Sequence, residues 1–165
     1  SIEKDGVKLL VMGTVQQGGG GCICPESTIL KALMNHLVLA RNEVVVMDME
    51  AGVEHLGRAT SGAVDALVIV VNPGKRSRVA ADKIRKLGQD IGIKNIVVLA
   101  NRVRSEADEA LVRETMTDYD ILGFIPEADE IAASDRDGSR PFENIDAIPE
   151  ALAAVTRKLM ALAEK

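Results

Sequence analysis

Residues 66–100 read "ALVIVVNPGKRSRVAADKIRKLGQDIGIKNIVVLA", and this stretch decides the fold class. It begins and ends with a continuous apolar run, at 66–71 and at 95–100. Apolar side chains recur at helical spacing between the two runs: Val79, Ile84, Leu87 and Ile91. Apolar runs that do not alternate with polar residues are typical of strands buried on both faces. The stretch therefore predicts two parallel strands joined by a helix over about 76–91.

The same alternation continues on both sides of this unit. Further strands are expected at 7–12, 43–48 and 120–125, and further helices at 26–40, 106–117 and 148–163. Ser105 precedes the 106–117 helix as a good N-cap, and the polar stretch 133–146 is expected to be a surface loop. Strands that alternate with helices predict an open, mostly parallel α/β sheet flanked by helices. No linker or repeat interrupts the pattern, so residues 1–165 are expected to form a single domain.

The composition narrows the class of protein. Of the 165 residues, 47% are hydrophobic and only 2% aromatic, so the core must be built from aliphatic side chains. The formal net charge of −5 argues against a nucleic-acid-binding face. No apolar run approaches the roughly 18 residues needed to cross a bilayer, and the charged N-terminal stretch does not read as a signal peptide. Two cysteines are no disulfide framework, so a cytoplasmic location is expected.

Both cysteines lie in the stretch "GGGGCICPES" at 18–27. Cys22 and Cys24 can direct their sulfur atoms to one side of a loop, which makes half of a tetrahedral thiolate site. Zinc or nickel prefers about four ligands, so two chains related by a twofold axis would complete the site. One alternative is a pair of inert, buried small residues. A redox pair is the other, although the thioredoxin-type spacing is Cys-x-x-Cys.

A second candidate element is "VVVMDMEAGVEHLGRAT" at 44–60. The predicted strand delivers Asp48 at its C-terminal end, where ligands bind in open α/β sheets. There the carboxylate is suited to hold a Mg²⁺-bound water beside a nucleotide phosphate, and the Gly52 amide is suited to sense the terminal phosphate. The alternative is that Asp48 simply caps the following helix.

Two further strand ends carry candidate binding residues. Asn101 follows the run at 95–100, and its side-chain amide is suited to pair with the edge of a purine. Pro126 follows the strand at 120–125, so its loop is expected at the same edge of the sheet. The alternatives are a turn residue for Asn101 and a strand stop for Pro126.

Taken in order, "GGGGCICPE", "DMEAGVEHLGR", "VDALVIVVNPGKRS" and "LANRV" resemble the CooC family of carbon monoxide dehydrogenase maturation ATPases, which are relatives of the MinD-type ATPases. The similarity covers essentially all 165 residues. It implies that Cys22 and Cys24 bind nickel or zinc at a homodimer interface. It further implies that ATP-driven dimerisation is coupled to nickel insertion into carbon monoxide dehydrogenase, the client enzyme.

The resemblance also assigns nucleotide contacts. Asp48 would lie in the switch beside Mg²⁺, and Gly52 near the terminal phosphate of ATP. Asn101, with Arg102 beside it, would read adenine, and the backbone near Pro126 would flank the base.

The chain departs from the family at its front. Family members begin with a strand and a Lys-Gly-Gly-x-Gly-Lys-Thr loop, and no stretch of this sequence fits a phosphate loop. The chain resembles the C-terminal two-thirds of such a protein. Without the strand that normally lies beside the Asp48 strand, either the neighbouring strands close up or a sheet edge is exposed. Metal binding is expected to survive, whereas ATP hydrolysis by the chain alone is not.

Two other functions stay open at this point. One is a non-catalytic metal-binding or interaction domain that has lost nucleotide hydrolysis. The other is a relative of the partitioning-type ATPases in which the cysteines are incidental.

Overall fold

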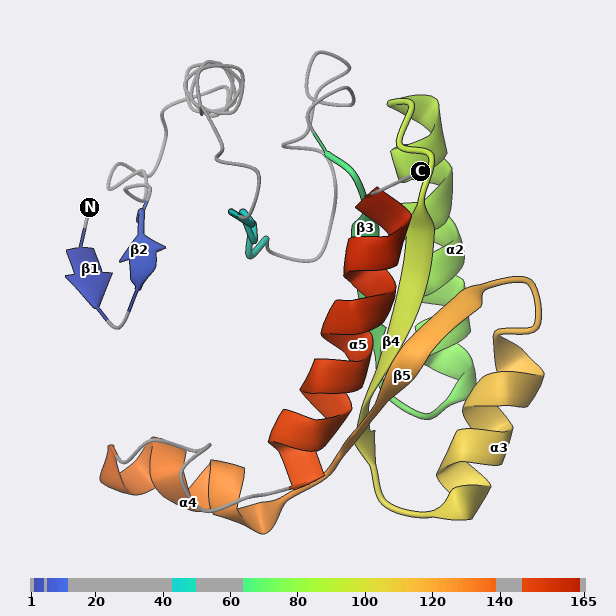
Figure 1. Cartoon of the computed structure of the whole chain (residues 1–165). Coiled ribbons are helices and arrows are strands. Elements are labelled where there is room, and N and C mark those ends of the chain that lie inside the picture. Colours follow the sequence, from blue (N-terminus) through green and yellow to red (C-terminus); the bar gives the residue numbers. More distant parts are fainter. Residues whose placement is uncertain (1, 5, 12–42, 50–63, 139–146, 164–165) are drawn as a thin grey trace, which may run out of the picture.

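The computed structural model describes residues 2–4, 6–11, 43–49, 64–138 and 147–163. Within these ranges, the centre of the fold is a parallel three-stranded sheet with the order β3-β4-β5 (Figure 1). Its strands are β3 (Leu67–Val71), β4 (Ile96–Val103) and β5 (Asp120–Pro126). This confirms the three strands predicted at 66–71, 95–100 and 120–125, and with them the α/β class.

Helices follow the strands, and three of the described helices confirm those predicted at 76–91, 106–117 and 148–163. The described helices are α2 (Lys75–Asp90), α3 (Glu106–Thr115), α4 (Asp129–Asp137) and α5 (Ala147–Ala163). Ser105 is the N-cap of α3, because its hydroxyl accepts a hydrogen bond from the Asp108 amide at 3.3 Å. None of the described helices is long and apolar enough to cross a membrane.

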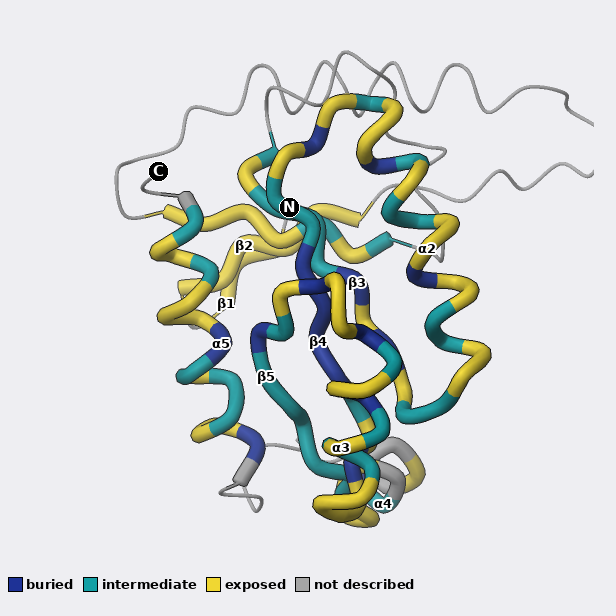
Figure 2. Tube along the Cα trace, turned by 90° about the vertical axis from the view of Figure 1, so that its right-hand side faces the viewer, coloured by how far each residue is buried: buried dark blue, intermediate teal, exposed yellow. Residues whose placement is uncertain are grey.

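The sheet is covered on both faces, which is why its strands are continuously apolar (Figure 2). One face packs against α2 and α3; its buried residues are Ile69, Val71, Ala81, Val98, Ala100, Val103, Val112, Met116 and Tyr119. The other face packs against α5; its buried residues are Val97, Leu99, Leu122 and Val155. Successive residues of β4 therefore contribute to opposite clusters, as the alternation of side chains along a strand requires.

The N-terminal prediction needs correction. The strand expected at 7–12 is only β2 (Val7–Leu9), and it pairs antiparallel with β1 (Ile2–Lys4) instead of joining the parallel sheet. All six residues of this hairpin are exposed. The run was expected to be a strand of the parallel sheet, but β2 pairs instead with β1, the strand that directly precedes it in the chain.

The strand predicted at 43–48 is wrong. Residues 43–49 contain no strand, and Val44, Val45 and Val46 are exposed. Of this segment only Met47 and Met49 pack against the cluster around buried Ile93. A β-branched run becomes a buried strand only when a neighbouring strand accepts its hydrogen bonds and helices cover its faces.

Two smaller differences concern helices. The polar stretch 133–146 was expected to be a loop, but α4 extends to Asp137 and ends at Gly138 in the left-handed conformation, with φ at 73°. The helix expected at 26–40 lies outside the described residues.

The outer edge of β3 is open within the described part of the chain. β3 is the first strand of the sheet order, and β4 is the strand with which it pairs. Val70, the fourth of the five residues of β3, keeps 58% of its surface exposed.

Candidate nucleotide site at the carboxyl edge of the sheet

Three of the sequence-predicted residues meet at the carboxyl edge of the sheet. Asn101 and Arg102 lie near the end of β4, and Pro126 is the last residue of β5. The ends of the two strands are paired, because Val103 lies opposite Pro126. Open α/β sheets bind ligands at this edge. The parallel pairing therefore brings together the residues expected to contact a nucleotide base.

The backbone of β4 is irregular where these residues lie. The register with β5 shifts between Ala100 and Val103, and Arg102 has a φ of 58°. Among the described residues, Arg102 is the non-glycine residue with positive φ. This left-handed conformation costs an L-residue roughly 1–2 kcal/mol, and such strained residues concentrate at functional sites.

Glu127, directly after β5, contacts the end of β4 in three ways. Its amide donates a hydrogen bond to the Val103 carbonyl oxygen at 3.0 Å. Its carboxylate forms an ion pair with Arg102, at 3.4 Å from Nε, and a second one with the Arg104 guanidinium. The hydrogen bond from Arg104 is the main reason that the pKa of Glu127 is lowered.

Arg104 is itself fixed by the start of α3. Its amide donates a hydrogen bond to Asp108 Oδ2 at 2.9 Å, while the Asp108 amide donates to the Ser105 hydroxyl. The acidic first turn of α3, which includes Asp108, also suits the positive end of the helix dipole. Hydrogen bonds of the backbone and an ion pair of the Arg104 side chain therefore both restrain the loop between β4 and α3.

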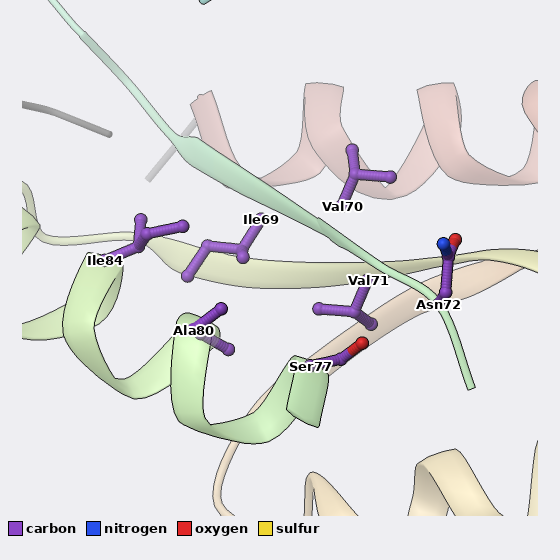
Figure 3. Close-up of a pocket in the computed structure, with 8 residues that line it drawn as sticks. Ile69, Val70, Val71, Asn72, Ser77, Ala80 and Ile84 are labelled. Atoms are coloured by element: carbon purple, nitrogen blue, oxygen red, sulfur yellow. The ribbon is translucent and has the colours of Figure 1, made fainter. Parts of the chain in front are cut away.

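A cavity of about 300 Å³ lies beside this edge, between β3 and α2 (Figure 3). Ile69 and Val71 point from β3 toward α2, whereas Val70 points toward the opposite face. Asn72 and Ser77 supply the polar side chains of the lining, and no titratable side chain takes part. The cavity therefore offers mainly apolar surface and no titratable acid or base for a reaction.

The densest polar network lies on the α2 and α3 face and serves the fold. Arg78 Nη1 donates hydrogen bonds to Asp118 Oδ1 at 2.5 Å and to the Thr115 carbonyl oxygen at 2.8 Å. Arg78 Nε also donates to Asp82, whose carboxylate accepts a hydrogen bond from the Tyr119 hydroxyl at 2.8 Å. The hydrogen bond from Arg78 is the main cause of the lowered pKa of Asp82. Every charge in this network is paired, so we assign it to holding α2 against the turn before β5.

The remaining predicted residues are separated from this edge or fall outside the described ranges. Asp48 is exposed in the irregular segment 43–49. Cys22, Cys24 and Gly52 lie outside the described residues, so the thiolate site stays a prediction. In the part of the chain that the structure describes, no three His, Cys, Asp or Glu side chains are grouped to hold a metal ion.

Comparison with known proteins gives close relatives. An uncharacterized ATP-binding protein of Methanocaldococcus jannaschii is 45% identical over 142 residues, 81% of this chain and 55% of that protein. The carbon monoxide dehydrogenase accessory protein CooC of Rhodospirillum rubrum is 44% identical over 137 residues, 83% of this chain and 52% of CooC. The chain belongs to the CooC family. No protein-family model matches it.

A third relative extends the match along the whole chain. Another ATP-binding protein of Methanocaldococcus jannaschii is 33% identical over 167 residues, 99% of this chain and 63% of that protein. This member of the CooC family thus spans little more than half the length of the first two relatives. Its α/β sheet with flanking helices is consistent with a P-loop NTPase-like fold.

Sequence analysis missed two residues of the candidate site, Arg104 and Glu127. The sequence "IPE" at 125–127 places a carboxylate directly after the strand-end proline, which was a usable signal. Nothing in the spacing pairs that carboxylate with arginines 23 and 25 positions earlier, because the pairing follows from the register of β4 and β5.

Proposed function

We propose that this chain is part of an ATP-dependent accessory protein for the maturation of carbon monoxide dehydrogenase, which it would supply with nickel. The observation that carries the proposal is the 44% identity to CooC over 83% of the chain. Nickel is the cargo in this proposal, and carbon monoxide dehydrogenase is the client.

The nucleotide would lie at the carboxyl edge of the sheet. Asn101 would pair with the purine edge, Arg102 would lie beside the ring, and the backbone near Pro126 would flank it. The pairing of Val103 with Pro126 supports this assignment, because it brings the ends of β4 and β5 to one place. Asp48 and Gly52 would serve the Mg²⁺ ion and the terminal phosphate.

The metal would be held between two chains. Cys22 and Cys24 supply two thiolates per chain, half of what a tetrahedral nickel or zinc site needs. A homodimer joined through this loop would complete the ligand set. A reducing cytoplasmic compartment would keep both thiols available for metal.

Phosphate release from the purified 165-residue chain, with and without nickel, tests the catalytic part of the proposal. We expect no turnover above background, because phosphoryl transfer depends on groups that position and neutralise the phosphates, and the sequence contains no phosphate loop. A longer form with a phosphate loop ahead of Ser1 should hydrolyse ATP.

Asp48→Asn is the matched control for this measurement. Turnover by the 165-residue chain that disappears in Asp48→Asn would mean that the chain is catalytic as it stands. In that case, the dependence on a phosphate loop would be wrong.

A second candidate function is favoured by the lack of phosphate-loop spacing in the sequence. The chain would then be a non-catalytic metal-binding or interaction domain of the same family. Nucleotide binding separates the two candidates: adenine-dependent binding by the chain supports the first, and metal binding without any nucleotide binding supports the second.

A further inference from the structure

We propose that Glu127 is a positioning residue of the adenine site and acts by holding the Arg102 side chain in place at the end of β4. This inference rests on the proposed nucleotide function and adds to it a residue that neither contacts the base nor belongs to the motifs of the sequence.

The carboxylate of Glu127 forms ion pairs with two arginine side chains. One carboxylate, whose side chain is only 20% exposed, is paired with Arg102 and Arg104, whose side chains are 65% and 73% exposed. The carboxylate thus lies more deeply than both guanidinium groups, which remain open to solvent. A guanidinium that is held on one side keeps a planar face with which it can stack on an aromatic ring such as a purine.

The backbone gives an independent reason to look for function here. Arg102 adopts the left-handed conformation that glycine adopts without steric cost. Exposed ion pairs contribute little to stability, so the pair with Glu127 does not explain why a strained arginine occupies this position. Placement of the arginine side chain at the carboxyl edge of the sheet does explain it.

Glu127 also fixes the distance between the two strand ends. Its amide donates a hydrogen bond to the Val103 carbonyl oxygen, and its side chain pairs with the residues on either side of Val103. The end of β4, with Asn101 and Arg102, is thereby attached to the end of β5, with Pro126. Loss of the charge on Glu127 would release Arg102 while the backbone hydrogen bond stays in place.

The test compares the affinities of the 165-residue chain for ATP and for inorganic tripolyphosphate, measured by calorimetry. The ratio of the two affinities measures how much the nucleoside contributes to the binding of ATP. We expect Glu127→Gln to weaken ATP binding by about 1.4- to 5-fold, the range that corresponds to the strength of an exposed ion pair, and to leave tripolyphosphate binding unchanged. Glu109→Gln is the matched control, because Glu109 is paired with Arg113 on the surface of α3.

Arg102→Ala separates positioning from a general structural role. If Glu127 acts through Arg102, Glu127→Gln should have no further effect on the affinity ratio in the Arg102→Ala background. At roughly 1 M salt, where charges are screened beyond about 3 Å, the ratio for the wild-type chain should approach that of Glu127→Gln. The urea midpoint of Glu127→Gln should match that of Glu109→Gln.

Two results would overturn the inference about Glu127: an unchanged ratio in Glu127→Gln, whether or not both affinities fall, or additive losses in the double variant. The wild-type chain tests the proposed function by itself. Absence of ATP binding, or ATP bound no more tightly than tripolyphosphate, would overturn the adenine site and the role of Glu127 together.

Discussion

Tyr119 is the single tyrosine of the sequence, and its environment is the most unusual of the described side chains. It is buried, and its hydroxyl donates a hydrogen bond to Asp82. The guanidinium groups of Arg78 and Arg85 lie 5.2 and 4.7 Å from the centre of its ring. Burial, followed by the hydrogen bond to Asp82, raises the pKa of Tyr119 from 10.0 to about 12.

The raised pKa predicts a direct spectroscopic result. Because the sequence has no tryptophan, near-ultraviolet absorbance reports the ionisation of this one phenol. We expect a midpoint near the raised pKa of about 12 in the folded chain and near 10 in urea. The folded-state pKa is the higher one, so the stability that this group contributes is complete below pH 10 and is lost as the pH rises toward 12.

Tyr119→Phe is the control for this prediction. The variant should lose less unfolding free energy than the wild-type chain between pH 10 and 12, since it has no phenol to ionise. A folded wild-type chain whose phenol titrates near 10 would contradict the burial of Tyr119.

The left-handed backbone of Arg102 makes a second prediction at this scale. Arg102→Gly and Arg102→Ala both remove the side chain, but only glycine adopts a positive φ without a clash. Urea unfolding should therefore find Arg102→Gly more stable than Arg102→Ala by about 1 kcal/mol. Equal stability of the two variants would show that the backbone at this position relaxes without cost.

At the scale of elements, glycines set how closely helices approach the sheet. A Cβ atom added at Gly123 in β5 would lie 3.0 Å from Val155 Cγ2 in α5. One added at Gly88 in α2 would lie 3.0 Å from side-chain atoms of both Leu67 and Ile96. Both faces of the sheet thus depend on a residue without a side chain to allow close packing.

We predict that Gly123→Ala destabilises the chain by about 1–3 kcal/mol, the usual cost of overpacking a core. Val155→Ala should also destabilise it, by roughly 2 kcal/mol, because it removes two buried methyl groups. The double variant should be more stable than the sum of the two losses indicates, by at least about 1 kcal/mol, since the new methyl group fills the vacated space.

Urea unfolding of the four chains measures this coupling. Strictly additive losses would mean that α5 shifts away from β5 as a unit instead of resisting the added atom. Gly88→Ala is a useful comparison, because its neighbours Leu67 and Ile96 are unaffected by the change at Val155.

At the scale of the whole molecule, a sheet with both faces covered leaves its edges as the places for assembly and ligands. The carboxyl edge carries the candidate base site, and the outer edge of β3 is unpaired within the described residues. The strand at this edge, Leu67–Val71, consists entirely of apolar residues. Exposed strand edges of this kind favour pairing with another strand.

The proposed thiolate site predicts that assembly depends on metal. Under reducing conditions, nickel or zinc should raise the mass found by sedimentation to that of two chains, with about one ion per two chains. Combined Cys22→Ser and Cys24→Ser should abolish the shift, whereas Ser27→Ala, three residues after Cys24, should preserve it. A cysteine-free variant that still dimerises with metal would exclude thiolate bridging.

The sequence by itself determined the succession from β3 to β5. The runs at 66–71 and 96–100 contain no polar residue, which favours burial on both faces. Ser105 marks the start of α3, because its side chain accepts a hydrogen bond from the amide three residues later. It also placed Asn101 and Pro126 at one sheet edge, because consecutive parallel strands end on the same side. These features depend on local pattern and on the direction of the chain.

Only the tertiary structure decided which segments pair and which charges meet. The run at 43–48 contains three consecutive valines, yet these are exposed, and no described strand lies beside them. Arg104 meets Glu127 across 23 positions, and Tyr119 meets Asp82 across 37. Such contacts follow from strand register, from the bulge at Arg102 and from close helix packing. The physical reason is that the burial of a strand and the capping of a helix depend on residues that are close together in the sequence. The partners of a strand and of a charged side chain, in contrast, come from residues that are far apart in the sequence.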